Sequence, residues 1–200
     1  ATQEMLRPGY RENGTSRCYF CKAELLDVVG GHLSVLPAGA RVATGTNADD
    51  LVAGFRPGIR AAADRGAVTP LADAGMSKQL IRDTAREWGL AIWDKPQAAC
   101  LSSRVAYGIQ ISPQRLARVE AAELALRRAL ADSGVSSVDV RVRDLGEQAR
   151  IEVDAELAGR PGAWQAAAVA AVAGCGFAEA WIDPQGFRSG SMNEGLLPTT

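Results

Sequence analysis

Two of the four cysteines form a Cys-x-x-Cys pair, Cys18 and Cys21. This spacing occurs in zinc sites, in iron–sulfur clusters and in redox-active pairs. A zinc ribbon built from cysteines alone would need a second pair of this kind, and the sequence has none. The pair therefore predicts either a site completed by one distant cysteine or two thiols that bind nothing.

Cys100 lies in an irregular segment that also contains Lys95 and Arg104. Irregular segments between regular elements are common positions for clefts and functional residues. The two basic side chains would favour the thiolate, which is the form that acts as a nucleophile or binds a metal. We therefore expect a reactive Cys100, with a buried inert cysteine as the alternative. Cys175, at the end of an alanine-rich helix, is expected to be of the inert kind.

A polar loop follows the apolar run at residues 40–43. Loops at the ends of strands in α/β sheets commonly bind ligands, and their hydroxyl and amide groups can bind phosphate oxygens. Paired carboxylates can hold Mg²⁺ beside a nucleotide phosphate. The alternative is a turn whose Asn and Asp side chains cap the next segment. The candidate residues are Thr46, Asn47, Asp49 and Asp50.

Arg141 and Arg143 lie two apart on a predicted strand, so both point away from the valine face. Glu152 faces the same way on the predicted partner strand. Two guanidinium groups near a carboxylate suit phosphate or carboxylate recognition, with a solvated sheet face as the alternative. Glu123 falls inside the apolar stripe of its helix, so its carboxylate needs an arginine, a metal or a neighbouring subunit.

The elements that must position these residues change in character near Cys100. In the first half, strand, polar loop and helix follow one another, which is typical of α/β architecture. The apolar run at residues 21–33 predicts a helix and residues 40–43 a buried strand. Ser77 begins a further helix that Gly89 ends.

The second half has the pattern of a small α+β domain. Ser112-Pro113 predicts the start of a helix that runs to about residue 131. Alternating residues at 138–143 and 150–153, with Gly146 between them, predict a hairpin. A helix at residues 162–173 and a strand at residues 177–182 follow. The predicted domains are residues 1–97 and 112–200, with a linker carrying Cys100 at residues 98–111.

Composition limits the class of protein. The chain is 47% hydrophobic and 22% charged, as in soluble globular proteins, and its net charge of −1 gives no support for nucleic-acid binding. The longest apolar stretch, residues 166–173, is too short to cross a bilayer. No secretion signal precedes the first motif, so we expect a cytoplasmic protein without membrane contacts whose cysteines are thiols.

An ordered set of short motifs resembles the LarE family, the ATP-dependent sacrificial sulfur transferases of the PP-loop superfamily. This family helps to build the nickel-pincer cofactor of lactate racemase. No single motif is decisive, but their order is specific. The motifs are RCYFCK at 17–22, GTNADD at 45–50, RPG at 56–58, WDKP at 93–96, ACLSSR at 99–104, YG at 107–108, RVR at 141–143, RIEV at 150–153 and RSGS at 188–191.

The resemblance implies a Rossmann-like PP-loop nucleotide domain, which binds ATP and Mg²⁺, followed by a small α+β domain for substrate binding and oligomerisation. A carboxylate of pyridinium-3,5-biscarboxylic acid mononucleotide would be adenylated, and the thiolate of Cys100 would attack it. Cleavage of the C–S bond would leave a thiocarboxylate on the product. In members with one cysteine that residue becomes dehydroalanine. Members with three cysteines hold a [4Fe-4S] cluster that delivers sulfide, and Cys18, Cys21 and Cys100 match that pattern.

Further roles are implied by the same resemblance. Glu123 and Glu152 would take the positions of acidic residues at a metal-binding contact between subunits, in a homo-oligomer built as a trimer-based hexamer. The residues expected to bind the nucleotide substrate are Ser102, Ser103, Arg104, Arg141 and Arg143.

The sequence departs from the family in two ways. The Ser-Gly-Gly-x-Asp-Ser motif that grips the pyrophosphate of ATP is absent, so we expect the chain to begin after it and to be inactive in adenylation by itself. The second departure is that a few more residues than in the family separate Glu123 from Arg141. Two alternatives stay open: a PP-loop thiolase or synthetase that acts on tRNA or another nucleotide, and a non-catalytic metal-binding assembly module.

Overall fold

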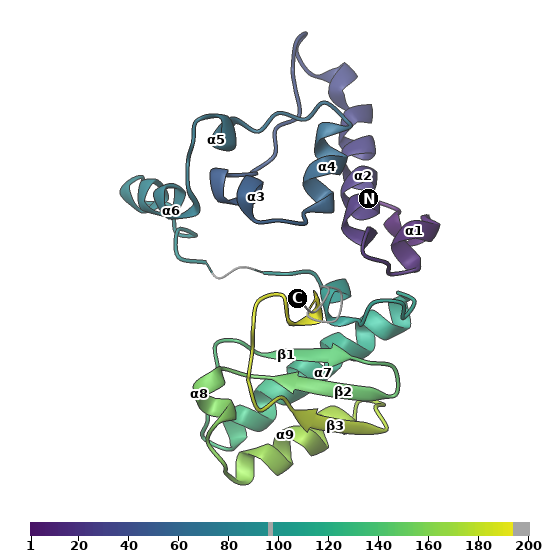
Figure 1. Ribbon diagram of the computed structural model, residues 1–200, viewed down its shortest axis with the longest axis vertical. Helices are drawn as coiled ribbons and strands as arrows, with labels where there is room; N and C mark the ends of the chain where they lie inside the picture. The colour runs from purple at the N-terminus through teal and green to yellow at the C-terminus, as the bar shows by residue number, and fades with distance from the viewer. Residues whose placement is uncertain (96–97, 194–200) are drawn as a thin grey trace. The chain divides into compact units, whose positions relative to one another are not determined.

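The computed structural model describes residues 1–95 and 98–193 and divides the chain into two compact units, Ala1–Ala98 and Ala99–Thr200 (Figure 1). Each unit is described by itself. Pro96, the last residue of the WDKP motif, lies outside the described residues. The described chain mixes many helices with one small sheet, and the Rossmann-like assignment of the first unit stays a prediction.

The first unit is built from helices. Helices α2 and α4 pack against each other, and small side chains at their contact, Ala23, Ala61 and Ala62, are buried. The elements are the 3-10 helices η1 (Glu4–Leu6) and η2 (Leu33–Val35) and the helices α1 (Pro8–Arg11), α2 (Arg17–Gly31), α3 (Ala48–Val52), α4 (Pro57–Ala63), α5 (Pro70–Asp73) and α6 (Lys78–Glu87).

The start of α2 was predicted too late. The helix begins at Arg17 rather than at residue 21, so it contains both Cys18 and Cys21. The start gives no clear signal in the sequence, because the side chain of Ser16 makes no capping hydrogen bond. Residues three apart on a helix lie on the same side, so the two cysteines are neighbours on α2.

The prediction of a buried strand at residues 40–43 is wrong. The segment forms only an isolated parallel bridge between Ala43 and Val68, and Arg41 and Ala43 are exposed. Its backbone hydrogen bonds join Thr44 N to Val68 O and Val68 N to Val42 O, both at 2.9 Å. A strand needs a continuous row of such partners, and this one bridge does not supply it.

The predicted helix after Ser77 is confirmed. The hydroxyl of Ser77 accepts a hydrogen bond from Leu80 N (3.1 Å), and α6 ends just before Gly89, whose φ is 69°. None of the helices in the described part of the chain combines the length and apolar character needed to cross a bilayer.

The second unit contains a three-stranded sheet with the order β1-β2-β3. Strand β1 pairs with β2 antiparallel, and β2 pairs with β3 parallel through a crossover that contains α8 and α9. Its elements are η3 (Leu101–Arg104), α7 (Pro113–Asp132), β1 (Arg141–Asp144), β2 (Gln148–Glu152), α8 (Ala155–Ala158), α9 (Ala163–Ala173), β3 (Glu179–Ile182) and η4 (Ser191–Asn193).

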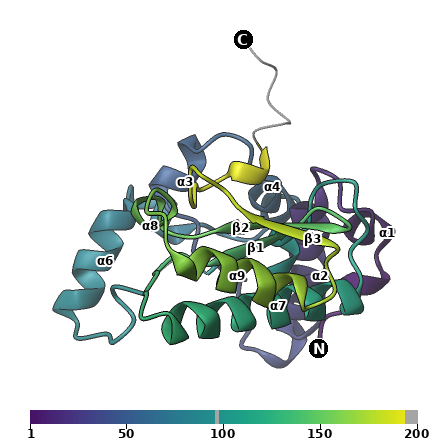
Figure 2. The same cartoon turned by 90° about the horizontal axis from the view of Figure 1, so that it is seen from below.

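Helices α7 and α9 cover one face of this sheet (Figure 2). The core between them includes Leu126, Val142, Ile151 and Val172, which are buried completely. The predicted helix at Ser112-Pro113 is confirmed, since the Ser112 hydroxyl accepts from Arg115 N at 3.2 Å.

The hairpin is confirmed, but β1 is shorter than predicted. Val138 is 75% exposed, and the strand begins only at Arg141. The N–H groups of Val138 and Asp139 donate to the carboxylate of Asp154, each at 2.9 Å, instead of pairing with a strand. Beyond that point the side chains alternate. Valine and isoleucine face the helices, whereas the arginines and Glu152 lie on the opposite face, which we call the arginine face: Arg141, Arg143, Arg150 and Glu152.

Candidate functional site

Cys100 is exposed and immediately precedes η3. Its backbone carbonyl accepts three hydrogen bonds, from Ser103 N (3.0 Å), Ser103 Oγ (2.7 Å) and Arg104 Nη1 (3.0 Å). These bonds fix the turn while leaving the thiol at the surface. The sequence thus places an accessible sulfur on a backbone that is held in one conformation.

Arg104 ties this turn to the sheet. Its side chain is almost fully buried, its Nη1 donates to Ala99 O (2.7 Å), and its Nε donates to Glu123 Oε1 (2.9 Å). The same Glu123 oxygen accepts from Val142 N (3.2 Å), on the edge of β1 that β2 leaves open. An arginine and a backbone N–H therefore both bond one oxygen of the carboxylate on the apolar stripe of α7. Its predicted role in metal binding stays a prediction.

Glu152 organises the arginine face. It is completely buried, and its Oε2 accepts from Nε and Nη2 of Arg143 at 2.8 and 2.6 Å. Its Oε1 accepts from Arg150 Nη2 (3.0 Å) and from the Ser191 hydroxyl (2.8 Å). Arg143 Nη1 reaches the carbonyl of Ser103 at 3.3 Å. The turn that carries Cys100 therefore lies against the arginine face. The positive charge of Arg143 is neutralised by the buried carboxylate of Glu152.

Arg141 differs from Arg143. Within the described residues its guanidinium donates one hydrogen bond, to Val140 O (2.8 Å), and its ion pair with Asp139 spans 4.0 Å. Burial lowers the pKa of Arg141 from its usual value, and the positive charge of nearby Arg104 lowers it further. A bound anion would relieve both effects. On this face Arg141 is thus the guanidinium best suited to take an oxyanion.

Three contributors to this face were missed in the sequence. Arg150 lies two residues before Glu152 on β2, so strand alternation alone could have placed it there. Ser191 belongs to the RSGS motif, but nothing local indicates that its hydroxyl reaches Glu152. Phe187, whose ring lies 5.2 Å from the Arg141 guanidinium, also has no local signal.

In the loop at residues 44–50 the carboxylates act as helix caps. Asn47 and Asp50 form a capping box at the start of α3, with Asp50 N donating to Asn47 Oδ1 (3.1 Å) and Asn47 N to Asp50 Oδ2 (3.3 Å). Asp49 Oδ2 accepts from Lys78 N (2.8 Å) at the start of α6. The Thr46 hydroxyl lies 3.0 Å from that of Thr44. These contacts match the capping alternative, and binding of ATP and Mg²⁺ stays a prediction.

The remaining cysteines lie apart from this site in the sequence. Cys18 is exposed and Cys21 half-buried, both in the first unit. Cys175 is half-buried just after α9, and its Sγ donates to Ala171 O at 3.4 Å; that it is inert stays a prediction. Over residues 1–95 and 98–193, no group of three or more His, Cys, Asp or Glu side chains is arranged to hold a metal ion. The three-cysteine cluster stays a prediction.

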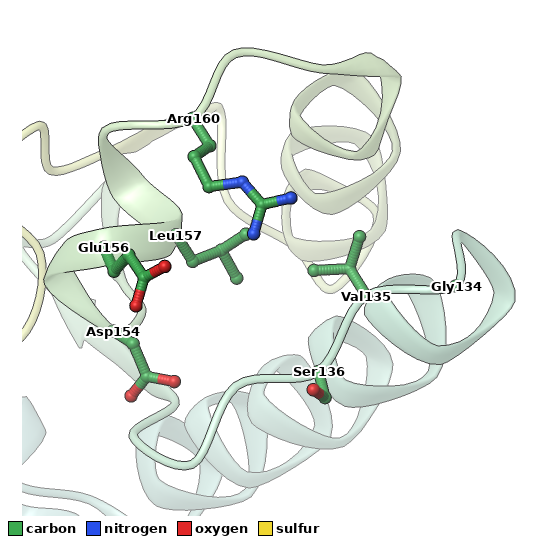
Figure 3. A pocket seen from close by; sticks show the side chains of 7 residues that line it. All are labelled: Gly134, Val135, Ser136, Asp154, Glu156, Leu157 and Arg160. Carbon is green, nitrogen blue, oxygen red and sulfur yellow. The ribbon is translucent and has the colours of Figure 1, made fainter.

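A pocket of about 240 Å³ opens elsewhere in the second unit (Figure 3). None of the site residues predicted from the sequence lines it. The carboxylate of Asp154 points to it but is already bonded to the N–H groups of Val138 and Asp139. The lining residues are Gly134, Val135, Ser136, Asp154, Glu156, Leu157 and Arg160.

Comparison with known proteins supports the resemblance of the motifs. No family model matches the chain. The chain is 39% identical over 197 residues to "Uncharacterized protein slr1717" of Synechocystis sp. The matched residues cover 98% of the chain and 70% of that protein. It is also 34% identical over 142 residues to pyridinium-3,5-bisthiocarboxylic acid mononucleotide synthase of Lactiplantibacillus plantarum. This match covers 71% of the chain and 49% of the synthase.

A third relative is "Uncharacterized protein MJ0830" of Methanocaldococcus jannaschii, 31% identical over 146 residues, with 73% of the chain and 54% of that protein covered. The chain therefore spans about half the length of this relative and of the synthase.

Proposed function

The chain belongs to the family of the Synechocystis protein slr1717 and is a homologue of the Lactiplantibacillus synthase, and we propose that it serves ATP-dependent sulfur transfer to a pyridinium mononucleotide. The substrate is pyridinium-3,5-biscarboxylic acid mononucleotide, and the product carries a thiocarboxylate on the way to a nickel-pincer cofactor. Cys100 handles the sulfur.

One observation carries this proposal. The exposed thiol of Cys100 stands on a turn whose Ser103 carbonyl is hydrogen-bonded to the arginine face, at Arg143. An exposed thiol on a turn that is bonded to guanidinium groups suits a reaction between sulfur and an anionic substrate. All of these residues belong to the second unit.

The chemistry assigns a separate task to each residue. The carboxylate is first activated as an adenylate, with ATP as co-substrate and pyrophosphate as the leaving group. The Cys100 thiolate attacks the activated carbonyl carbon, and AMP departs with the bonding electrons, which leaves a thioester. Transfer of the α-proton of residue 100 to a base then breaks the Cβ–S bond. The sulfur departs as a thiocarboxylate, and residue 100 becomes dehydroalanine.

The surrounding side chains orient the reactants. Arg104 and Ser103 hold the Cys100 turn, so the sulfur has a fixed position relative to the substrate. Arg141 binds an oxyanion of the mononucleotide. Ser102 is buried and packs within the turn that carries Cys100. In a three-cysteine version, Cys18, Cys21 and Cys100 would hold an iron–sulfur cluster that supplies sulfide. The homo-oligomer remains part of the proposal.

The test is a sulfur-transfer assay with the complete protein, ATP, Mg²⁺ and the biscarboxylic acid mononucleotide. We expect a product in which sulfur has replaced a carboxylate oxygen, detected by mass spectrometry, together with release of AMP and pyrophosphate. Anaerobic assays of iron and sulfide distinguish the cluster version. A protein that binds iron but neither ATP nor the mononucleotide would favour the assembly-module alternative.

Replacing Arg141 with Gln should raise the substrate KM by about ten- to a hundredfold, since a charge-assisted hydrogen bond to an oxyanion contributes roughly 1.5–3 kcal/mol. The turnover number should change little, because Arg141 does not touch the sulfur. Arg128→Gln is the matched control, an exposed arginine on α7. Equal KM values for the two variants would show that Arg141 does not bind the substrate.

A further inference from the structure

Phe187 reaches the arginine face by an unusual course of the chain after β3. Asp183 N still pairs with Ile151 O (2.8 Å), and the chain then makes a tight turn in which Gly186 N donates to Asp183 O (3.0 Å). It then pairs with the residue that directly follows β2, since Phe187 N donates to Val153 O (2.7 Å). Backbone bonds on both sides of the turn thus fix the position of Phe187.

The close approach of this turn to β2 depends on glycine at position 186. Gly186 has a φ of 67°. A Cβ atom there would lie 2.5 Å from Ala155 Cα and 2.8 Å from Val153 O. Both the left-handed conformation and the lack of space exclude a side chain. The absence of a Cβ lets Phe187 lie directly beside the end of β2.

The ring of Phe187 supports the Arg141 guanidinium, whose carbon lies 5.2 Å from the ring centroid. Arg141 is paired in register with Glu152 across the hairpin. However, the oxygens of Glu152 are already occupied by Arg143, Arg150 and Ser191. The cation of Arg141 therefore rests on an aromatic face rather than on the carboxylate opposite it in the hairpin. An aromatic ring orients a guanidinium but leaves its N–H donors and most of its charge available.

We propose that Phe187, held by Gly186, is the positioning residue that presents Arg141 to the oxyanion of the mononucleotide. This inference rests on the proposed function, since it assumes that Arg141 binds substrate. The oxyanion is either the phosphate monoester or a ring carboxylate, because both suit a guanidinium fork. Phe187 does not touch the reacting atoms. It acts by holding the arginine in one orientation before the substrate arrives.

The test measures binding rather than turnover. Nicotinic acid mononucleotide is titrated into the complete protein by calorimetry, and nicotinic acid riboside is the probe without phosphate. Phe187→Leu should weaken mononucleotide binding by about tenfold, and Phe187→Tyr should restore the wild-type Kd, because a cation–π contact needs the ring. If Arg141 holds the phosphate, Phe187→Leu should not weaken binding of the riboside. If it holds the carboxylate, both probes lose affinity equally.

Phe177→Leu is the matched control. The Phe177 ring makes a similar contact with Arg118, at 4.1 Å, but Arg118 lies on the helix side of the sheet. It should leave the Kd unchanged. In the Arg141→Gln background, Phe187→Leu should have no further effect on Kd, which a purely structural role would not predict. If the leucine variant does not fold, Phe187→Met keeps a similar apolar volume without the ring.

An unchanged Kd in a folded Phe187→Leu or Phe187→Met variant overturns the inference, and so does a further loss of affinity in the Arg141→Gln background. Failure of the wild-type protein to bind pyridinium-3,5-biscarboxylic acid mononucleotide in the same calorimetric titration overturns the proposed function itself, and this inference with it. The two failures are therefore distinct.

Discussion

Cys100→Ala in the complete protein is expected to abolish sulfur transfer, with no thiocarboxylate above background. The reason is chemical: without a nucleophilic sulfur at residue 100, the activated carboxylate has no thiol to attack it. Cys100→Ser should fail equally, because a hydroxyl can form an ester but supplies no sulfur. Release of pyrophosphate in the presence of substrate should persist in both variants, since activation precedes the attack.

Cys175→Ala is the matched control. Its thiol is half-buried against the core of the second unit and bonded to Ala171 O, so its loss should leave the rate of sulfur transfer unchanged. The measurement is product formation by mass spectrometry under single-turnover conditions. Normal activity in Cys100→Ala would show that Cys100 is not the sulfur-handling residue. The same would follow if only Cys175→Ala lost activity.

Asp144→Ala is expected to destabilise the second unit by about 3 kcal/mol, because it leaves two partly buried arginines without their counter-charge. Asp144 is completely buried on the helix side of β1. Its Oδ1 accepts from Arg115 Nη1 (2.6 Å) and Gly146 N (2.9 Å), and its Oδ2 accepts from Arg118 Nη2 (2.8 Å). It therefore joins α7 to the hairpin.

Urea unfolding followed by circular dichroism measures this effect. Asp144→Asn keeps the shape and part of the hydrogen bonding, so it should cost less than the alanine variant. Glu120→Ala, an exposed acidic residue on the same helix α7, should change the free energy of unfolding by less than about 0.5 kcal/mol. A loss no larger than that of Glu120→Ala would show that the buried network contributes little.

The parts of the fold that sequence could predict are those fixed by local rules. Ser77 and Ser112 cap their helices as expected, because a cap needs only a hydroxyl and the next turn of backbone. Where a distant partner decides the conformation, prediction failed. Residues 40–43 lack a row of strand partners, and the N–H groups at 138 and 139 are taken by Asp154, which lies beyond the hairpin.

In the candidate site, too, local rules could be predicted from the sequence, whereas contacts with distant residues could not. Alternation correctly placed Arg141, Arg143 and Glu152 on one face of the sheet. It could not distinguish the two arginines, because both lie on the same face of the same strand. Their difference arises from pairing in three dimensions: Glu152 closes on Arg143, whereas Phe187 lies beside Arg141. The partner of Glu123 was likewise left open among an arginine, a metal and a subunit, and the described chain supplies Arg104.

We propose that the thiol of Cys100 and the arginine face act on one substrate. The most direct measurement is the rate at which iodoacetamide alkylates Cys100, followed by peptide mass spectrometry, with and without pyridinium-3,5-biscarboxylic acid mononucleotide. Cys175 serves as the internal reference. We expect that the mononucleotide, at a concentration near the wild-type Kd, slows alkylation of Cys100 in the wild-type protein but not in Arg141→Gln. A mononucleotide that binds the protein, as measured by calorimetry, while Cys100 reacts at an unchanged rate would contradict it.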